Sequence, residues 1–166
     1  PRVLELCSGS GCIAVAREKH LPGGDITAVE KSEQAYGYLL RNLERHGSRV
    51  EPVLADALDY RPAGSYDLIA ANPPYVGEGE RGLLSAETAF EPPEALFAGE
   101  EGLYFYRELT ARYAPALRAG GVLAYEIGYA QGDAVAGILQ RAGLGDIRVE
   151  KDYGGNDRVV SGIRET

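Results

Sequence analysis

The sequence predicts an α/β fold in which a mostly parallel sheet carries helices on both faces. Apolar strand-like runs alternate with stretches of helical periodicity along the chain, which is typical of parallel strands joined by helical crossovers. The last two strand-like runs are joined only by Tyr-Gly-Gly-Asn (residues 153–156), and so short a connection requires antiparallel pairing. The 166 residues, 45% of them apolar, suffice for a single domain with a proper core.

The elements follow from the local pattern, in chain order. A short apolar strand over 2–6 precedes a helix over 11–20 with small and apolar residues at helical spacing. A second strand over 25–30 leads to a helix that Ser32 caps and Gly47 ends. Strand three contains Pro52, which is best tolerated at a sheet edge. That third strand covers 50–56, and the fourth covers 66–72. The elements after them are helix 101–120, strand 121–128, helix 130–143 and strands 146–152 and 157–163, which bring the strands to seven.

Composition excludes several classes of function. A net charge of −8 argues against a stand-alone binder of the nucleic-acid backbone. No apolar run approaches the ~18 residues that a membrane span needs, and no signal peptide is visible. Cys7 and Cys12 lack the spacing of a metal site or a useful disulfide, which favours a reducing cytoplasm and no metal. The chain contains no methionine and Pro1 leads directly into a strand, so we expect a fragment of a longer protein.

A glycine-containing turn, Cys7-Ser8-Gly9-Ser10-Gly11, connects the first strand to the first helix. Gly9 and Gly11 allow a sharp turn and a close approach of the backbone to a ligand, at which the helix N–H groups point. With Glu30 at the end of strand two as a ribose acceptor, the turn predicts an adenosine-containing cofactor. The spacing Gly9-x-Gly11-x-x-Ala14 also fits a dinucleotide fingerprint, so a nicotinamide- or flavin-dependent oxidoreductase remains an alternative.

The segment Asn72-Pro73-Pro74-Tyr75 after strand four favours methyl transfer to a planar nitrogen. Each proline fixes its own φ and restricts the residue before it, so the segment is stiff. The Asn72 side-chain oxygen and the Pro73 carbonyl can accept the two N–H groups of one amino group. Such acceptors orient the nitrogen and stabilise the positive charge that develops as the methyl arrives. Tyr75 supplies a flat face for the planar group of the substrate.

On these residues the chain resembles the PrmC/HemK family, the protein-(glutamine-N5) methyltransferases of class 1 peptide-chain release factors. The matching stretches are VLELCSGSGCIA, VEKS, DLIAANPPYV, FEPPEALFAGEEGLYFYR, YEIGYAQG and VEKDYGGNDRVV. The resemblance implies the Rossmann-like fold of class I S-adenosylmethionine-dependent methyltransferases, with S-adenosyl-L-methionine as the cofactor. It further implies methyl transfer to the glutamine of a Gly-Gly-Gln motif, in a monomeric cytoplasmic enzyme.

The resemblance also implies a role for each site residue. Residues 7–11 would hold the methionine part of the cofactor, Glu30 the ribose hydroxyls, and Asp56 and Ala57 the adenine. Asn72 to Tyr75 would bind the glutamine, with Asn72 also at the cofactor. Cys7 stands where many relatives have a glycine, and a positive φ there would cost cysteine ~1 kcal/mol.

Two points beyond the site follow from the resemblance. Family members carry an additional N-terminal helical domain that helps to dock the release factor, and no helical pattern precedes the glycine turn here. We therefore expect residues 1–166 to form the catalytic domain alone. An adenine-N6 nucleic-acid methyltransferase shares Asn-Pro-Pro-Tyr and remains an alternative, as does a non-catalytic module with only the cofactor pocket. The glutamate-rich stretch 78–101 is expected to be a solvated loop, or else a lid that attracts a basic partner.

Overall fold

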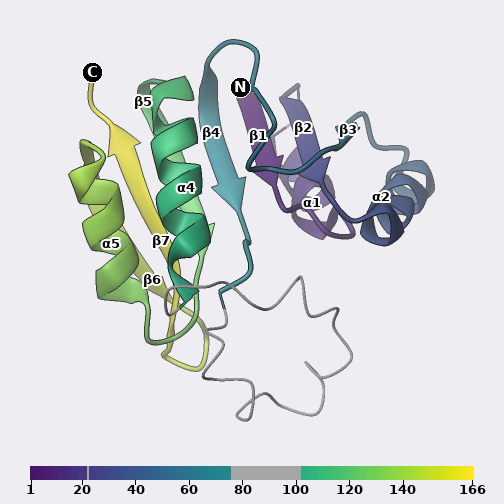
Figure 1. Cartoon of the computed structure of the whole chain (residues 1–166). Helices are drawn as coiled ribbons and strands as arrows, with labels where there is room; N and C mark the ends of the chain where they lie inside the picture. The colour runs from purple at the N-terminus through teal and green to yellow at the C-terminus, as the bar shows by residue number, and fades with distance from the viewer. Residues whose placement is uncertain (22, 76–101) are drawn as a thin grey trace.

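The computed structural model describes residues 1–21, 23–75 and 102–166, which form a seven-stranded sheet in the order β3-β2-β1-β4-β5-β7-β6 (Figure 1). Strands β1 to β5 pair in parallel, whereas β7 is antiparallel to both of its neighbours. The predicted sheet and its closing antiparallel hairpin are thus confirmed. The strands are β1 Arg2–Leu6, β2 Asp25–Glu30, β3 Glu51–Leu54, β4 Tyr66–Ala71, β5 Leu117–Glu126, β6 Leu144–Lys151 and β7 Asp157–Arg164.

Helices cover both faces of the sheet, as predicted. Leu4 and Leu6 of β1 pack in one apolar cluster with the helices α4 and α5, whereas Val3 packs in a second cluster with α1 and α2. This alternation is the period-two pattern of a strand that is buried on both faces. The helices are α1 Cys12–His20, α2 Glu33–His46, α4 Tyr104–Tyr113 and α5 Gly132–Arg141, with a 3-10 turn η4 at Ala114–Ala116 (Figure 1).

The predicted ends of α2 are confirmed. The Ser32 hydroxyl accepts a hydrogen bond from the Ala35 N–H at 3.3 Å, and Gly47 adopts a left-handed conformation at the C-terminus. Both devices satisfy backbone groups that have no partner inside the helix. Strand β3 lies at an edge of the sheet. An edge position tolerates Pro52 because a proline, which has no N–H, does not there interrupt the hydrogen bonds between two neighbouring strands.

The boundary between α4 and β5 differs from the prediction. The helix predicted for 101–120 covers only Tyr104–Tyr113, and the strand predicted to begin at residue 121 begins at Leu117. Pro115 has no N–H and cannot continue an α-helix, so a 3-10 turn replaces the last helical turn. Leu117 then pairs with Tyr66, and the irregularity between Tyr66 and Leu68 accommodates this early start.

Some predictions fall outside the described residues. The glutamate-rich stretch and most of the block FEPPEALFAGEEGLYFYR lie within 76–101. Within the described part of the chain, no helix is both long and apolar enough to cross a membrane.

Candidate active site

Strand register places the predicted site residues at one edge of the sheet. Leu6 of β1 pairs with Val29 of β2 and with Ala71 of β4. The residues that follow directly, Cys7, Glu30 and Asn72, therefore leave neighbouring strands at the same end. The strand order reverses between β1 and β4, and ligands of open α/β sheets bind at such a switch point, outside the carboxyl ends of the strands. The three strand ends therefore converge at one edge of the sheet.

The turn over residues 7–11 has the geometry that its glycines require. Cys7, Gly9 and Gly11 have φ values of 55°, 56° and 77°. A Cβ on Gly11 would collide with the Leu39 side chain of α2, which would have to move, and the φ of Gly11 itself favours glycine. A Cβ on Gly9 would meet nothing within 4 Å, which leaves open space above the turn. The positive φ of Cys7 bears out the strain expected for a residue other than glycine.

Glu30 holds this turn, a role that sequence reasoning missed. Its Oε2 accepts a hydrogen bond from the Gly9 N–H at 2.7 Å, and its Oε1 accepts one from the Ser32 N–H at 2.7 Å. A carboxylate has about four lone-pair sites, so each oxygen can still accept a ligand hydroxyl. Glu30 is only 8% exposed, which limits replacement of these bonds by water. The carboxylate thus joins the glycine turn, the start of α2 and the predicted ribose position.

The Cys7 thiol is not suited to act as a nucleophile. Burial, together with the nearby Glu30 and Asp56 carboxylates, raises its pKa to about 12. At neutral pH the side chain is a neutral thiol, whereas the thiolate is the reactive form. Covalent catalysis through Cys7 is therefore disfavoured. Among the residues that the structure describes, no three His, Cys, Asp or Glu side chains lie close enough together to hold a metal ion.

Asp56 and Ala57 lie directly beyond β3, where the adenine is predicted. The Asp56 Oδ1 accepts a hydrogen bond from the Leu58 N–H at 2.9 Å, and Oδ2 lies 2.7 Å from the Lys31 Nζ. Ala57 is buried, and its carbonyl accepts a hydrogen bond from the Tyr113 hydroxyl at 2.7 Å. These bonds hold the turn after β3 against Tyr113 of α4 and against Lys31, the residue that follows Glu30.

The segment 72–75 leaves β4 with its acceptors available. Neither the Asn72 side chain nor the Pro73 carbonyl has a hydrogen-bond partner among residues 1–21, 23–75 and 102–166. Pro73 is buried, and Asn72, Pro74 and Tyr75 are half-buried. The Tyr75 ring packs against the core cluster that contains α4 and α5. Two acceptors that have no partner within the described residues, in a stiff and partly buried segment, can receive an N–H₂ group.

The Ser8 hydroxyl gives independent evidence for a ligand here. Its oxygen is buried and has no hydrogen-bond partner within the described parts of the chain. Buried polar atoms in folded proteins are almost always hydrogen-bonded, so an exception calls for an explanation such as a missing ligand or water. Next to it, the turn has open space above Gly9 and Ser10 is half-buried. These residues fit a polar cofactor that lies along the turn.

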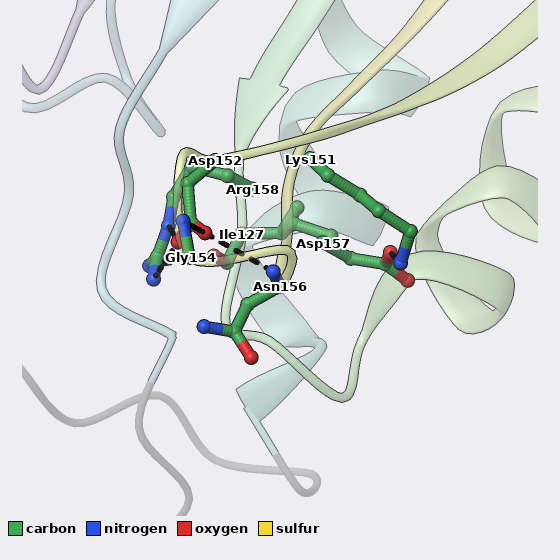
Figure 2. A network of polar contacts seen from close by, with 7 residues as sticks. All are labelled: Ile127, Lys151, Asp152, Gly154, Asn156, Asp157 and Arg158. Atoms are coloured by element: carbon green, nitrogen blue, oxygen red, sulfur yellow. Dashed lines mark hydrogen bonds and ion pairs between the residues drawn. The ribbon is translucent and has the colours of Figure 1, made fainter.

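Two sequence blocks without a predicted role, YEIGYAQG and VEKDYGGNDRVV, adjoin the segment 72–75. In the hairpin between β6 and β7, Asp152 accepts hydrogen bonds from the Gly154 and Asn156 N–H groups and from the Arg158 guanidinium, which also donates to the Ile127 carbonyl (Figure 2). The hydrogen bond to Asp152 is the main cause that raises the pKa of Arg158, and the Tyr75 hydroxyl also contributes. The hairpin is thus tied to the end of β5, near Tyr75.

Comparison with known proteins identifies the family of the chain. Residues 1–100 match the methyltransferase small domain family. The release factor glutamine methyltransferases of Geobacter sulfurreducens and Cereibacter sphaeroides are 40% and 43% identical to the chain over 163 residues, 96% of its length. The chain spans only 57% and 58% of these two relatives. The resemblance inferred from the sequence blocks is therefore confirmed.

Solved structures confirm the predicted fold. A methyltransferase from Pyrococcus furiosus superposes with a TM-score of 0.75 at 20% identity, covering 99% of this chain and 75% of that one. At this identity the likeness concerns the fold, which is the Rossmann-like fold of class I S-adenosylmethionine-dependent methyltransferases.

Proposed function

The chain belongs to the methyltransferase small domain family, and from this membership and its site we propose that it is the catalytic domain of a release factor glutamine methyltransferase. In this proposal it moves the methyl group of S-adenosyl-L-methionine to the side-chain amide nitrogen of a glutamine. The substrate is the glutamine of the Gly-Gly-Gln motif in class 1 peptide-chain release factors. Its relatives from Geobacter sulfurreducens and Cereibacter sphaeroides, which carry this activity in their names, support the choice of substrate.

The single observation that carries the proposal is the pair of available acceptors in the segment after β4. The Asn72 side-chain oxygen and the Pro73 carbonyl have no partner within the described residues, and Asn72 directly follows Ala71, which pairs with Leu6. The acceptors therefore lie beside the glycine turn, where the cofactor is expected. An amide N–H₂ has two donors and can occupy both acceptors at once.

The chemistry requires these residues to orient the substrate nitrogen and to stabilise the charge that develops on it. S-adenosylmethionine supplies an electrophilic methyl group on its sulfonium sulfur, and the C–S bond breaks as the new C–N bond forms. An amide nitrogen is a weak nucleophile because its lone pair is delocalised, so its orientation determines the rate. Asn72 and Pro73 hold both N–H groups, and their oxygens stabilise the positive charge that develops on the nitrogen. The positively charged nitrogen then loses one of these protons to water, and S-adenosylhomocysteine is the other product.

The remaining residues hold the cofactor in this proposal. Glu30 accepts the ribose hydroxyls with its free lone pairs, and Ser8 to Gly11 contact the methionine part. Asp56 and Ala57 lie at the adenine, while Tyr75 lies against the planar amide of the substrate. We also propose a cytoplasmic, monomeric enzyme that needs no nucleic acid, consistent with the net charge of −8.

Methyl transfer with labelled S-adenosylmethionine tests the proposal. We expect label in purified release factor, none in a release factor whose Gly-Gly-Gln glutamine is replaced by alanine, and none in duplex DNA. The Asn72→Ala variant should lose about 10²–10³-fold in rate, the scale for removing one transition-state hydrogen bond. Its affinity for S-adenosylhomocysteine should stay within a few-fold of wild type in calorimetry. Label in DNA alone, or full turnover by Asn72→Ala, would contradict the proposal.

A further inference from the structure

Gln131 connects the Asn72–Tyr75 segment to the end of β5. It lies in the turn before α5, and its Nε2 donates a hydrogen bond to the Tyr75 carbonyl at 2.9 Å. Its Oε1 accepts a hydrogen bond from the Gly128 N–H at 3.0 Å and a longer one from the Tyr106 hydroxyl at 3.4 Å. Every polar atom of this amide is therefore directed at a specific partner. A side chain fixed at both ends can define the position of what it holds.

The segment after β4 depends on such a side chain because it contains few donors of its own. Pro73 and Pro74 have no N–H, so these two residues can be held only through their carbonyls or by packing. Within the described residues, the hydrogen bond from Gln131 to Tyr75 is the only one made by residues 73–75. The stiffness of the prolines fixes the internal shape of the segment, but it does not fix where the segment lies relative to the sheet.

Close packing around Tyr75 restricts movement of the same carbonyl. Gly102 has φ +80°, and a Cβ there would collide with the Tyr75 carbonyl oxygen and lie 2.5 Å from the Gln131 Nε2. Gly102 also offers its own carbonyl to the Gln131 Nε2, at the limit of 3.5 Å. The backbone at Gly102 thus approaches Tyr75 and Gln131 more closely than any other residue type would allow.

The backbone just after β5, which contains the partner Gly128, is itself held firmly. Ile127, directly before Gly128, exchanges hydrogen bonds with Arg158: its N–H donates to the Arg158 carbonyl at 2.9 Å, and its own carbonyl accepts from the guanidinium at 3.3 Å. The Arg158 guanidinium is bound in turn to Asp152, which two backbone N–H groups of the hairpin also bind (Figure 2). The support behind Gln131 is therefore a β-hairpin with its own polar network.

We propose that Gln131 is a positioning residue for methyl transfer, which fixes the Asn72 and Pro73 acceptors by holding the Tyr75 carbonyl. This inference rests on the proposed function, because it assumes that these acceptors bind the substrate amide. It gives a role to two sequence blocks, YEIGYAQG and VEKDYGGNDRVV, that contact neither substrate nor cofactor in the proposed reaction. Gln131 acts through Tyr75 and touches no reacting atom.

The variant Gln131→Glu tests the inference, with Gln140→Glu as its control. Glutamate keeps the acceptor for Gly128 and Tyr106 but directs an oxygen instead of an N–H at the Tyr75 carbonyl. Gln140 lies exposed on α5, the helix that follows Gln131, so its variant carries the same change of charge without these contacts. We expect kcat for release factor to fall about 100-fold in Gln131→Glu, the scale for a misplacement of ~1 Å. KM, the affinity for S-adenosylhomocysteine and the melting temperature should stay close to those of Gln140→Glu.

Hydrogen exchange gives a readout that does not depend on activity. Amide exchange at Ala71, the last residue of β4, should become faster in Gln131→Glu because the segment that follows it is no longer held, while exchange in β1 stays as in wild type. If wild type fails to methylate release factor, the proposed function is wrong, and faster exchange would still support the anchoring by Gln131. An unchanged kcat or unchanged exchange would overturn the inference. If Gln131→Glu does not fold, Gln131→Ala decides in its place, and a loss of cofactor affinity that parallels the loss of kcat would indicate a general structural role instead.

Discussion

Replacing Glu30 with glutamine tests whether one carboxylate both holds the glycine turn and binds the cofactor. In the native structure the two oxygens accept from the Gly9 and Ser32 N–H groups, both at 2.7 Å. Glutamine has the same shape but only one oxygen. Whichever way its amide turns, an NH₂ group faces one of the two N–H donors, so at least one hydrogen bond is lost.

The magnitude follows from the character of these bonds. A hydrogen bond to a charged group contributes ~1.5–3 kcal/mol, and water replaces it poorly here because Glu30 is 8% exposed. For a protein of this size, each kcal/mol lowers the melting temperature by about 2–4 °C. Glu30→Gln should therefore melt about 5–10 °C below wild type. With the turn displaced and the negative charge removed, S-adenosylhomocysteine should bind at least about tenfold more weakly.

Differential scanning calorimetry and isothermal titration calorimetry measure the two effects. Glu44→Gln is a suitable control, because Glu44 lies exposed on α2 and its side chain makes no hydrogen bond or ion pair with the described residues. Its melting temperature and affinity should match those of wild type. If Glu30→Gln melts within about 1 °C of this control, the carboxylate does not hold the turn, and the assignment of its two hydrogen bonds is wrong.

Three further predictions concern pH, the glycine turn and the support of the adenine side. Burial raises the pKa of Glu5 from 4.5 to about 8, so the folded state keeps a proton that the unfolded state has lost. The free energy of unfolding should therefore fall by at most ~5 kcal/mol as pH rises from about 5 to 8. Melting experiments on Glu5→Gln should show most of this pH dependence removed. Gly11→Ala should destabilise the protein by at least ~1 kcal/mol, because the φ is +77° and the added methyl meets Leu39; a melting temperature equal to wild type would contradict this. Tyr113→Phe should cost ~1–2 kcal/mol in chemical denaturation, because the Ala57 carbonyl loses its donor, and an unchanged midpoint would refute that bond.

Local chemistry in the sequence determined most of the fold. The ends of α2 follow from Ser32 and Gly47, whose preferences act within a few residues. The parallel sheet follows from the alternation of strands and helices, and the antiparallel β7 from the short connection before it. The predicted boundary before β5 was wrong. The prediction gave the helical spacing of apolar residues more weight than Pro115, although a proline there prevents the helix from continuing.

The site divides in the same way. The sequence by itself predicted the glycine turn, Glu30 and the Asn72–Tyr75 segment as parts of the site, because these residue types have few uses other than turning, accepting or stiffening a chain. Only the tertiary structure decided that Glu30 binds Gly9 across 21 positions and that Gln131 binds Tyr75 across 56. A side-chain amide or carboxylate has no sequence spacing that identifies its partner. The partner is determined by strand register, which brings the ends of β1, β2, β4 and β5 to one edge of the sheet.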